Sequence, residues 1–301
     1  MPEEGIQFVR KDKLLSFEEM TRIITLFSEE GVNKIRITGG EPFLRKGIMS
    51  FLDEITSLEK IEKVAITTNG TLTTQYLDDL IKMGITSYNL SIDTIDKERF
   101  FAITRRDSFD AVWECYQMML DRKVNLKLNA VVMANQNIDD LIPMVELGIT
   151  DNVSIRFIEE MPFNGAGSHY TKLEWDHKKI LQHIEDHFGN VIKLPDPKNS
   201  TSFNYKVEGF KGSFGIIPAY TRSFCGSCNR LRLTPQGTIK TCLYDDGIFN
   251  LRDLMRAEAS DTEIITAVQE AVGTKAKDGF EAERSRKKLP SVSESMATIG
   301  G

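Results

Sequence analysis

Cysteine and histidine are both scarce in this sequence, which contains four of each among its 301 residues. So few cysteines in a chain of this size do not indicate a disulfide-stabilised secreted protein, and no charged-then-apolar leader opens the sequence. No apolar run approaches the roughly 18 residues that a membrane-spanning helix requires. These absences predict a cytoplasmic protein.

An excess of positive charge is also lacking, because the formal net charge is -6. The chain has no basic field for wrapping nucleic acid, so a polyanionic ligand would have to be small and bound by local arginines. The hydrophobic content of 41% is enough for a sizeable core in one large domain or two smaller ones. A polar connection that begins at Pro195 predicts a boundary between residues 1–194 and 195–301.

Three of the four cysteines, Cys225, Cys228 and Cys242, form the pattern C-x2-C-x13-C. Two thiolates on one turn and a third from a short hairpin can hold three irons of a 4Fe-4S cluster, which leaves the fourth iron open for a ligand. Arg230 and Arg232 alternate with leucines just after this turn, so on an extended segment both guanidinium groups point away from the leucines. Fixed cations beside an open metal indicate an anionic or oxygen-rich ligand.

A zinc site is the alternative for the same cysteines, but a structural zinc site closes with a fourth Cys or His. No histidine follows Cys242, because all four lie upstream, at His169, His177, His183 and His187. His183 and His187 share one helix face, and this spacing is interpreted as a solvated surface rather than a metal site. The fourth cysteine, Cys115, lies in the amphipathic run 109–120 and is expected to be a buried, inert thiol.

The apolar periodicity predicts alternating strands and helices. A helix is expected from Ser16, with Glu19 completing a capping box, to near Gly31. Strands are expected at residues 34–38, 64–68, 88–92, 126–133 and 153–158, with helical stretches at 47–58, 73–83, 109–121 and 138–147 between them. This repetition predicts parallel pairing, and because no G-x-G-x-x-G follows any strand, an incomplete parallel barrel fits better than a dinucleotide-binding sheet. Residues 204–207 and 213–217 indicate an antiparallel hairpin, and two helices are expected at 251–257 and 262–272.

Polar residues, together with one methionine, gather where the predicted parallel strands end, and in parallel barrels that edge carries the chemistry. They are Gly40, Glu41, Thr67, Asn69, Ser91, Asp93, Lys127, Arg156, Glu159 and Met161. A structural interpretation stays open for several of them: Gly40 in a tight turn, Thr67 in a turn with a helix cap, and Asp93 as the cap of the next helix. Lys127 differs, because a lysine inside the apolar run 124–133 needs an anion.

Six segments resemble the GTP 3',8-cyclase family, the radical S-adenosylmethionine enzymes that open molybdenum cofactor biosynthesis. They are RITGGEP at 36–42, TTNG at 67–70, NLSID at 89–93, RFIEEM at 156–161, FCGSCNRLR at 224–232 and GG at 300–301. The resemblance implies an α/β fold, an incomplete parallel (β/α)6 TIM-type barrel closed by a small α+β C-terminal domain, with a 4Fe-4S cluster at each end of a cavity. It also implies a lyase that cyclises GTP by radical chemistry to (8S)-3',8-cyclo-7,8-dihydroguanosine 5'-triphosphate.

The resemblance assigns roles to the residues that match the family's positions. Gly40, Ser91 and Met161 match contacts of S-adenosylmethionine. Arg36, Thr67 and Lys127 match contacts of GTP, and Arg230, Leu231 and Arg232 match the segment around its purine. Cys225, Cys228 and Cys242 match the ligands of the second cluster, whose open iron coordinates the base of GTP. Gly300 and Gly301 match a tail that enters the cavity beside the substrate.

One family feature has no counterpart in this sequence: the C-x3-C-x2-C loop that holds the first cluster. Met1 and Pro2 match the Met-Pro that follows this loop in the family, so the first strand of the barrel is also expected to be missing. Among a mis-placed start, a fragment and a degenerate homologue, the first is favoured, because the polar residues downstream are retained. The chain as written is expected to bind GTP without cleaving S-adenosylmethionine. The alternatives are a non-catalytic GTP-binding homologue that keeps only the C-terminal cluster, and a zinc-stabilised structural domain.

The resemblance also implies partners. GTP is the substrate, an electron donor supplies the reducing equivalent, and cyclic pyranopterin monophosphate synthase takes the product. The family is compatible with a homodimer. Neither nucleic acid nor a membrane is expected as a partner.

Overall fold

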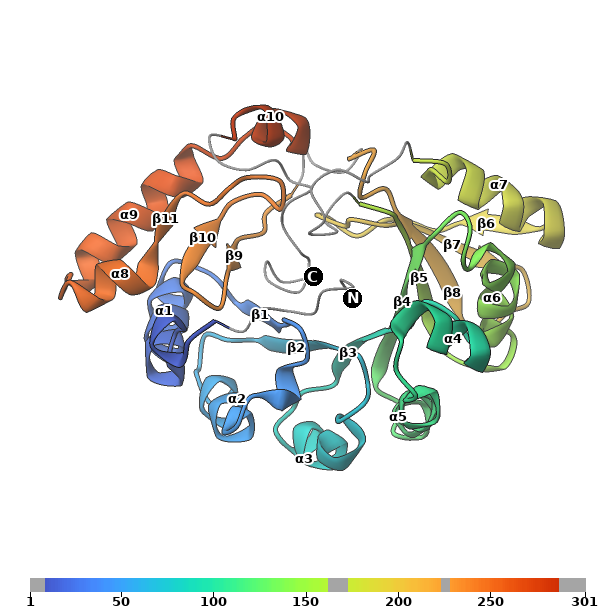
Figure 1. The fold of residues 1–301 in the computed structure, drawn as a ribbon, viewed down its shortest axis with the longest axis horizontal. Coiled ribbons are helices and arrows are strands. Elements are labelled where there is room, and N and C mark those ends of the chain that lie inside the picture. The colour runs from blue at the N-terminus through green and yellow to red at the C-terminus, as the bar shows by residue number, and fades with distance from the viewer. Residues whose placement is uncertain (1–8, 162–172, 223–227, 287–301) are drawn as a thin grey trace.

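The molecule is built on one sheet of eight strands, with helices packed along it (Figure 1). The computed structural model describes residues 9–161, 173–222 and 228–286. Six strands are parallel neighbours, in the order β1 (Lys34–Ile37), β2 (Lys63–Thr68), β3 (Ser87–Ser91), β4 (Asn125–Val132), β5 (Ser154–Glu159) and β8 (Ser213–Ile217). The sheet continues from β8 through two antiparallel strands, β7 (Phe203–Val207) and β6 (Val191–Lys193).

The five parallel strands expected from the sequence are present and pair in chain order, which confirms the predicted parallel arrangement. The predicted hairpin is also confirmed, because β7 and β8 pair antiparallel. β8 pairs with β5 as well, in parallel, and so supplies a sixth parallel strand. Residues on both sides of the predicted domain boundary at residue 194 therefore share one sheet, and the boundary itself stays a prediction.

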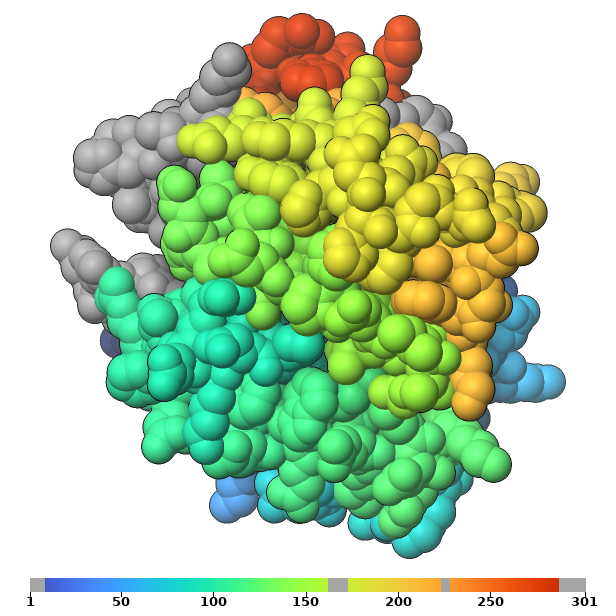
Figure 2. All heavy atoms as spheres, turned by 90° about the vertical axis from the view of Figure 1, so that its right-hand side faces the viewer, coloured from blue at the N-terminus to red at the C-terminus, as the bar shows by residue number. Residues whose placement is uncertain are grey.

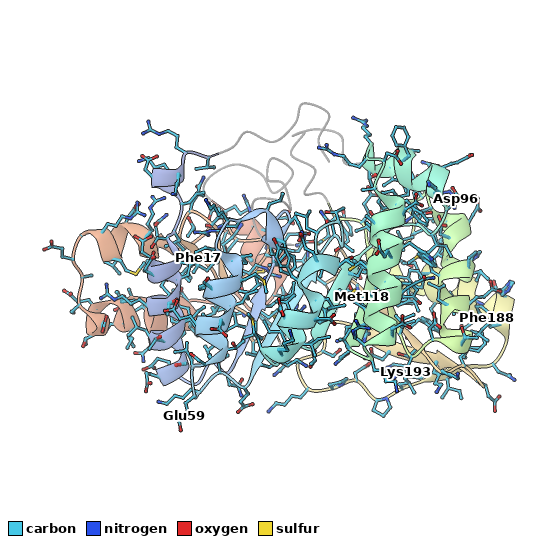
Figure 3. The ribbon with its side chains drawn as sticks, turned by 90° about the horizontal axis from the view of Figure 1, so that it is seen from below. Phe17, Glu59, Asp96, Met118, Phe188 and Lys193 are labelled. Atoms are coloured by element: carbon cyan, nitrogen blue, oxygen red, sulfur yellow. The ribbon has the colours of Figure 1, made fainter. Side chains whose placement is uncertain are left out.

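The first seven helices connect the strands and lie against one side of the sheet. Viewed from below, the outer helices stand beside one another in a row from α1, near Phe17, to α5, near Met118 (Figure 3). A perpendicular view shows α4 to α7 forming a continuous surface (Figure 2). The helices are α1 (Phe17–Glu29), α2 (Ile48–Thr56), α3 (Leu77–Lys82), α4 (Lys97–Thr104), α5 (Phe109–Asp121), α6 (Leu141–Thr150) and α7 (His177–Phe188), with short 3-10 turns at Lys11–Lys13, Pro42–Leu44, Thr74–Tyr76 and Ile138–Asp140.

Helix α1 begins as the sequence predicts. Ser16 Oγ accepts the backbone N–H of Glu19 at 3.1 Å, and the Glu19 carboxylate accepts the backbone N–H of Ser16 at 2.7 Å. This reciprocal capping box satisfies two backbone donors that the first helical turn leaves without an intrahelical acceptor.

Helix α4 was not predicted, and its N-cap is Asp96, whose Oδ1 accepts the N–H of Arg99 at 2.7 Å. The interpretation of Asp93 as the cap of the next helix is wrong, because α4 begins after Asp96 and α5 (Phe109–Asp121) begins after Ser108. Asp93 Oδ1 instead accepts the backbone N–H of Val131 at 2.8 Å, which ties the end of β3 to β4.

The two faces of the parallel strands differ sharply in polarity. Burial alternates along β4 and β5, so that Leu126, Leu128, Ala130, Ile155 and Phe157 are buried under the helices. Since side chains alternate across a strand, the intervening residues point to the opposite face. We call that face, which points away from the helices, the inner face.

The C-terminal residues form a second, smaller unit against α1. A three-stranded antiparallel sheet of β9 (Arg232–Leu233), β10 (Thr238–Lys240) and β11 (Phe249–Asn250) is followed by α8 (Leu251–Arg256), α9 (Asp261–Gly273) and α10 (Gly279–Arg284). The two helices predicted here match α8 and α9, whereas α10 was not predicted. Ile239, Leu251 and Ile264 share an apolar cluster with Ile23 and Leu26 of α1, so this unit is packed onto the large sheet's first helix.

Arginines hold the segment of residues 12–15 in the seam between the two units. Arg256 donates to the carbonyl oxygens of residues 12 and 14, Arg252 donates to that of residue 13, and Arg45 donates to that of residue 15. The N–H of residue 15 donates to the carbonyl oxygen of Pro235, in the turn between β9 and β10, at 2.9 Å. Four consecutive carbonyl groups therefore receive charged donors from both units, and we call this arrangement the arginine clasp.

Candidate active site

The inner face of the six parallel strands is polar and basic. It carries Lys34 and Arg36 on β1, Lys63 on β2, Lys127 on β4 and Arg156 on β5. The register alternates in the same sense on every strand, because Thr67 pairs with Asn89, which pairs with Lys127. No aspartate or glutamate occupies an inner-facing position of these six strands. The face therefore presents cations without a carboxylate of its own.

The neighbouring cations help to lower the pKa of Lys127. Desolvation lowers the pKa of Lys127 to about 8, and the neighbouring charges of Arg156, Arg36, Lys34 and Lys63 add to that shift. Each of these neighbours disfavours the protonated form of Lys127 because it carries the same charge. A bound polyanion would reverse this effect, so the inner face is suited to one.

Arg36 shows the same behaviour on β1. Its side chain is exposed, yet nearby protein desolvates it enough to lower its pKa, with a further contribution from Arg230. Arg36 Nη1 also donates to Thr67 Oγ1 at 3.3 Å. Three residues predicted to contact GTP, Arg36 on β1, Thr67 on β2 and Lys127 on β4, thus lie on one face of the same sheet.

The stretch of residues 230–232 faces these strands from the smaller unit. Arg230 lowers the pKa of Arg36 and of Lys34, which requires it to lie near both. Desolvation lowers the pKa of Arg232, and Arg230 adds to this. Leu231 packs instead in the apolar cluster of the smaller unit, so arginines and leucine point in opposite directions, as the alternation predicted.

Arg156 is held at the far side of the inner face by side chains of the β6–β7 region. Its Nη1 donates to Ser202 Oγ at 2.5 Å and to Asn204 Oδ1. Asn204 in turn donates to Asp196 Oδ1 from both its backbone N–H, at 2.9 Å, and its side-chain amide, at 2.7 Å. Desolvation nevertheless lowers the pKa of Arg156, although the charge of Asp196 opposes that shift. Arg156 thus stays a desolvated cation whose direction is fixed.

Sequence reasoning named Arg156 as polar but gave it no ligand, and it did not name Lys34 or Lys63. The alternation of side-chain directions along each strand could have identified these residues. All three residues occupy the same face as Arg36 and Lys127, and counting cations at those positions alone would have found them.

The residues predicted to contact S-adenosylmethionine follow three parallel strands at their carboxyl ends. Ser91 ends β3, Gly40 lies three residues after β1, and Met161 lies two residues after β5. Parallel strands bring these ends to one edge of the sheet. Gly40 has open space where a side chain would be. Met161 packs against the small apolar cluster around Tyr244, which Cys242 also contacts.

Glu41 follows Gly40 and is buried, with only 8% of its surface exposed. Its carboxylate accepts hydrogen bonds from Thr68 Oγ1, at 2.9 Å, and from the backbone N–H groups of Phe43 and Asn69. Burial raises the pKa of this carboxyl group. Glu41 therefore joins the loop after β1 to the loop after β2, and so positions the edge that carries Gly40.

Two of the three predicted cluster ligands, Cys228 and Cys242, are free thiols at partly buried positions, whereas Cys225 lies outside the described residues. Lys275 Nζ lies 4.0 Å from Cys228 Sγ and donates to the carbonyl oxygen of Arg230 at 3.1 Å. Burial raises the pKa of Cys242, and the charge of Arg232 opposes that shift. Soft thiolates with cations beside them fit an anionic iron–sulfur cluster.

Asp245 fixes the backbone at Cys242. Its Oδ2 accepts the N–H of Cys242 at 2.7 Å, the N–H of Thr241 at 2.8 Å and the hydroxyl of Thr241 at 3.0 Å. Within the ranges that the structure describes, no group of three metal-ligating side chains is assembled. The zinc alternative thus gains no further ligand from these ranges.

The burial predicted for the remaining cysteine is confirmed. Cys115 is fully buried in α5, and burial raises its pKa to about 11, which disfavours the reactive thiolate. His183 packs edge-on against Trp175, and His187 against Phe188. His169, Met1, Pro2, Gly300 and Gly301 lie outside the described residues.

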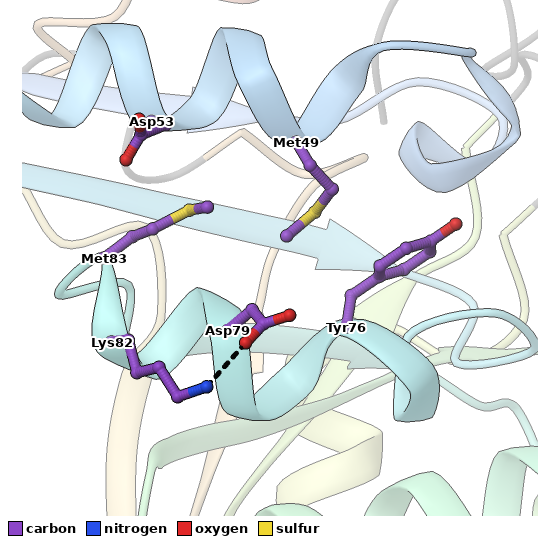
Figure 4. A pocket seen from close by; sticks show the side chains of 6 residues that line it. All are labelled: Met49, Asp53, Tyr76, Asp79, Lys82 and Met83. Carbon is purple, nitrogen blue, oxygen red and sulfur yellow. Dashed lines mark hydrogen bonds and ion pairs between the residues drawn. The ribbon is translucent and has the colours of Figure 1, made fainter.

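A groove of about 450 Å³ lies elsewhere on the molecule, between α2 and α3 (Figure 4). It is lined by Met49, Asp53, Tyr76, Asp79, Lys82 and Met83. Lys82 and Asp79 already form an ion pair at 2.7 Å. Because α2 and α3 cover the side of the sheet away from the inner face, this groove is not part of the candidate site.

No helix among the residues described is both long and apolar enough to cross a membrane.

Comparison with known proteins covers nearly the whole chain. The model of the Radical SAM superfamily matches residues 3–148, and that of Molybdenum Cofactor Synthesis C matches residues 153–280. The chain is 40% identical to the molybdenum cofactor biosynthesis protein moc-5 of Caenorhabditis elegans, over 91% of this chain and 46% of that protein. It spans about half the length of the relatives of this type.

Shorter relatives are covered more fully. The chain is 36% identical to the mitochondrial GTP 3',8-cyclase of Arabidopsis thaliana, over 92% of this chain and 70% of that protein. It is 33% identical to the GTP 3',8-cyclase of Clostridium perfringens, over 90% of this chain and 84% of that protein. Among solved structures, SuiB of Streptococcus suis overlays on 67% of this chain and 43% of its own, with a TM-score of 0.48 at 20% sequence identity.

Proposed function

This chain belongs to the GTP 3',8-cyclase family, and from that premise we propose that it binds GTP on its inner face and takes part in the first step of molybdenum cofactor biosynthesis. The reaction is the radical cyclisation of GTP to 3',8-cyclo-7,8-dihydroguanosine 5'-triphosphate, and the enzyme class is a radical S-adenosylmethionine lyase. The finer architecture, an incomplete (β/α)6 barrel of residues 1–194 and a domain of residues 195–301, is part of this proposal, as is a cytoplasmic location.

One observation carries the proposal: the inner face holds several desolvated cations and no carboxylate. A nucleoside triphosphate brings several negative charges and many acceptor oxygens to such a face. Charge-assisted hydrogen bonds to phosphate are the strong ones in proteins, and Arg36, Lys127 and Arg156 supply them from three different strands. The mutual repulsion that lowers the pKa of Lys127 would be relieved on binding.

The residue roles in this proposal come from the family resemblance. Arg36, Thr67 and Lys127 would hold the phosphates and ribose from the sheet, while the segment of Arg230, Leu231 and Arg232 would hold the purine through its two arginines, because the side chain of Leu231 packs in the apolar cluster of the smaller unit. Gly40, Ser91 and Met161 would hold S-adenosylmethionine at the carboxyl edge of the strands. In the family's reaction, S-adenosylmethionine that receives one electron would yield methionine and a 5'-deoxyadenosyl radical, and that radical would remove a hydrogen atom from the ribose. The chain's own part is to fix the ribose and to exclude water and stray hydrogen donors.

Cys225, Cys228 and Cys242 are the proposed ligands of a 4Fe-4S cluster that presents one open iron to the guanine base. Asp245 would keep Cys242 in place, and Lys275 would balance the negative charge near Cys228. A second set of three cysteines is not present among the four of this sequence, so the residues present do not fit a second cluster.

The proposal further includes an electron donor, cyclic pyranopterin monophosphate synthase as the consumer of the product, and a homodimer as the assembly. Anaerobic titration of the purified protein with GTP, followed by calorimetry, tests the central claim. Lys127→Ala and Arg36→Ala are each expected to weaken GTP binding about 10- to 100-fold, from the loss of a charge-assisted hydrogen bond. Lys178→Ala, at an exposed position of α7 on the helix side of the sheet, is the control and should bind GTP as the parent does. Unchanged affinity in both site variants would place the GTP site elsewhere.

A further inference from the structure

Glu159, the last residue of β5, is a fully buried carboxylate that gathers three separate segments. Its Oε1 accepts the backbone N–H of His177 at 2.7 Å and lies 3.1 Å from His177 Nδ1. Its Oε2 accepts the backbone N–H groups of Tyr220, at 2.9 Å, and Thr221, at 2.8 Å. The hydroxyl of Thr221 lies 2.9 and 3.0 Å from the two carboxylate oxygens.

A carboxylate without solvent is costly unless donors surround it, and here backbone N–H groups supply most of them. Two consecutive N–H groups converge on Oε2, and the third belongs to the first residue of α7, where the helix dipole also favours a negative charge. Each donor lies on a segment far from Glu159 in the sequence. The carboxylate therefore sets the position of the start of α7 and of residues 220–221 relative to the end of β5.

Glu159 and Thr221 both lie close in the sequence to residues of the proposed site. Met161 lies two residues after Glu159, and Thr221 lies four residues before Cys225. The carbonyl oxygen of Ala219 accepts the hydroxyl of Tyr244 at 3.0 Å, and Tyr244 lies two residues after Cys242. The stretch 219–221 is thus fixed from one side by Glu159 and from the other by the chain that carries Cys242.

The next residue strengthens this second connection. Arg222 has a backbone φ of 56°, in the left-handed region that a branched or long side chain rarely adopts. Its guanidinium carbon lies 3.5 Å from the centre of the Tyr244 ring, and its Nη1 donates to the carbonyl oxygen of Gly279 at 2.9 Å. Strain of this kind persists only where surrounding contacts fix the backbone.

We infer that Glu159 is a positioning residue for the proposed site: it fixes the stretch 219–221 and, through the contact of this stretch with Tyr244, the position of Cys242 relative to the edge that carries Met161. The claim that the positioned residues form a ligand site rests on the proposed function. The claim that Glu159 anchors the stretch 219–221 rests on the hydrogen bonds of Glu159 alone. Glu159 needs no contact with substrate for this role.

Thr221 offers a graded test, because Thr221→Val removes only the hydroxyl and Thr221→Ser keeps it. Glu159→Gln is the stronger change, since its amide nitrogen would face backbone N–H groups that need an acceptor. Glu208→Gln, an exposed carboxylate on the loop between β7 and β8, is the matched control. Each variant is purified without oxygen in the form that holds the cluster, and amide hydrogen exchange, the thermal midpoint, the rate of iron release and the visible absorbance of the cluster are measured.

Thr221→Val is expected to release iron about tenfold faster than the parent, with faster exchange confined to the amides of His177, Tyr220 and Thr221, from the loss of one hydrogen bond to a charged group. Thr221→Ser should restore both values, and Glu208→Gln should change neither. Glu159→Gln should show a larger effect in the same amides. Faster exchange with unchanged iron release in Thr221→Val would overturn the inference, and so would unchanged exchange at these amides.

Measurements on the unmutated protein distinguish a failure of this inference from a failure of the proposed function. A parent that holds no iron–sulfur cluster contradicts the proposed function, and the exchange of the three amides then decides whether Glu159 anchors this stretch. Equal iron release from Thr221→Val and Thr221→Ser, in a parent that holds the cluster, contradicts the positioning role while the proposed function stands.

Discussion

The guanidinium group of Arg156 passes directly over Gly215, the neighbouring residue on β8. A Cβ atom built on Gly215 would lie 2.0 Å from Arg156 Nη1, which is far inside van der Waals contact. The absence of a side chain at Gly215 is therefore what allows Arg156 to reach Ser202 and Asn204. One cation of the inner face depends on a glycine in another strand.

Gly215→Ala is expected to displace the Arg156 side chain and to weaken GTP binding about tenfold, because one charge-assisted contact loses its geometry. Calorimetry with GTP measures the effect. Gly273→Ala, at the end of α9, is the control: a Cβ there meets no atom within 4 Å, so it should leave binding unchanged and the thermal midpoint equal or slightly higher. Parent-like affinity in Gly215→Ala would show that Arg156 takes no part in binding.

Much of this fold could be predicted from the sequence, because local signals and burial agree. The strands alternate in polarity along β4 and β5, and the capping box of Ser16 and Glu19 marks the start of α1. Helix α4 was missed because its apolar residues follow no clear stripe; of its eight residues only Phe100 is buried. β6 has three residues, too few for a periodic signal.

The site could be predicted only in part, for a different reason. Thr67 and Lys127 were named from the strand pattern and Arg36 through the resemblance, which gave all three their GTP role, and their shared face follows from the strand pattern. The relation of Arg156 to Gly215, and the capture of Tyr220 and Thr221 by Glu159, join residues that are 59 to 62 positions apart. No local pattern encodes such contacts, since they depend on how β8 packs beside β5.

The lowered pKa of Lys127 predicts how pH affects GTP binding. In the free protein this pKa is about 8, so raising the pH through that value removes the charge before GTP arrives. GTP affinity is expected to fall between pH 7 and 9. Lys127→Arg should flatten this dependence, since an arginine stays protonated there, and Lys127→Met should bind weakly at every pH. A parent whose affinity is flat over this range would show that Lys127 does not meet the phosphates.

The lowered pKa of Lys127 also makes the free energy of unfolding depend on pH. The folded pKa lies below the unfolded value of about 10.4, so between these two pH values the unfolded chain binds more protons. The contribution of Lys127 to the free energy of unfolding is therefore unfavourable below about pH 8 and becomes less so as the pH rises towards 10.4. Urea unfolding of the parent and of Lys127→Met, without GTP, should show their difference in stability shrinking over that window. A difference that grows with pH would contradict it.

Asp245→Ala is expected to destabilise the turn that carries Cys242. The change leaves the N–H groups of Thr241 and Cys242 without their acceptor, at a cost of about 1 to 3 kcal/mol for each buried group. The thermal midpoint and the iron content should both fall. Asp121→Ala, at the exposed end of α5, is the control and should leave both unchanged. Full iron content in Asp245→Ala would show that this carboxylate is not needed to place Cys242.

The arginine clasp predicts a link between the two units. Arg252→Met removes the donor to the carbonyl oxygen of residue 13 from a largely buried position, so it should lower the free energy of unfolding by about 1 to 3 kcal/mol. Proteolysis near residues 12–15 should become faster. Arg10→Met is the control, because the side chain of Arg10 is 84% exposed and its ion pair with Asp12 is worth little. Equal cleavage rates in the two variants would mean that the clasp does not hold this segment.

The number of irons bound distinguishes the cluster from its alternatives. The 301 residues contain four cysteines, and Cys115 is fully buried in α5 with its pKa raised to about 11, so only Cys225, Cys228 and Cys242 can serve together as thiolate ligands. A polypeptide of these residues, reconstituted without oxygen, is therefore expected to hold about four irons and about four sulfides, the content of one cluster. Cys242→Ser should lose most of both, whereas Cys115→Ala should keep them. About eight irons per chain would require a second ligand set that this sequence does not contain. One zinc per chain with no sulfide would show that the cysteines form a structural zinc site and not a cluster.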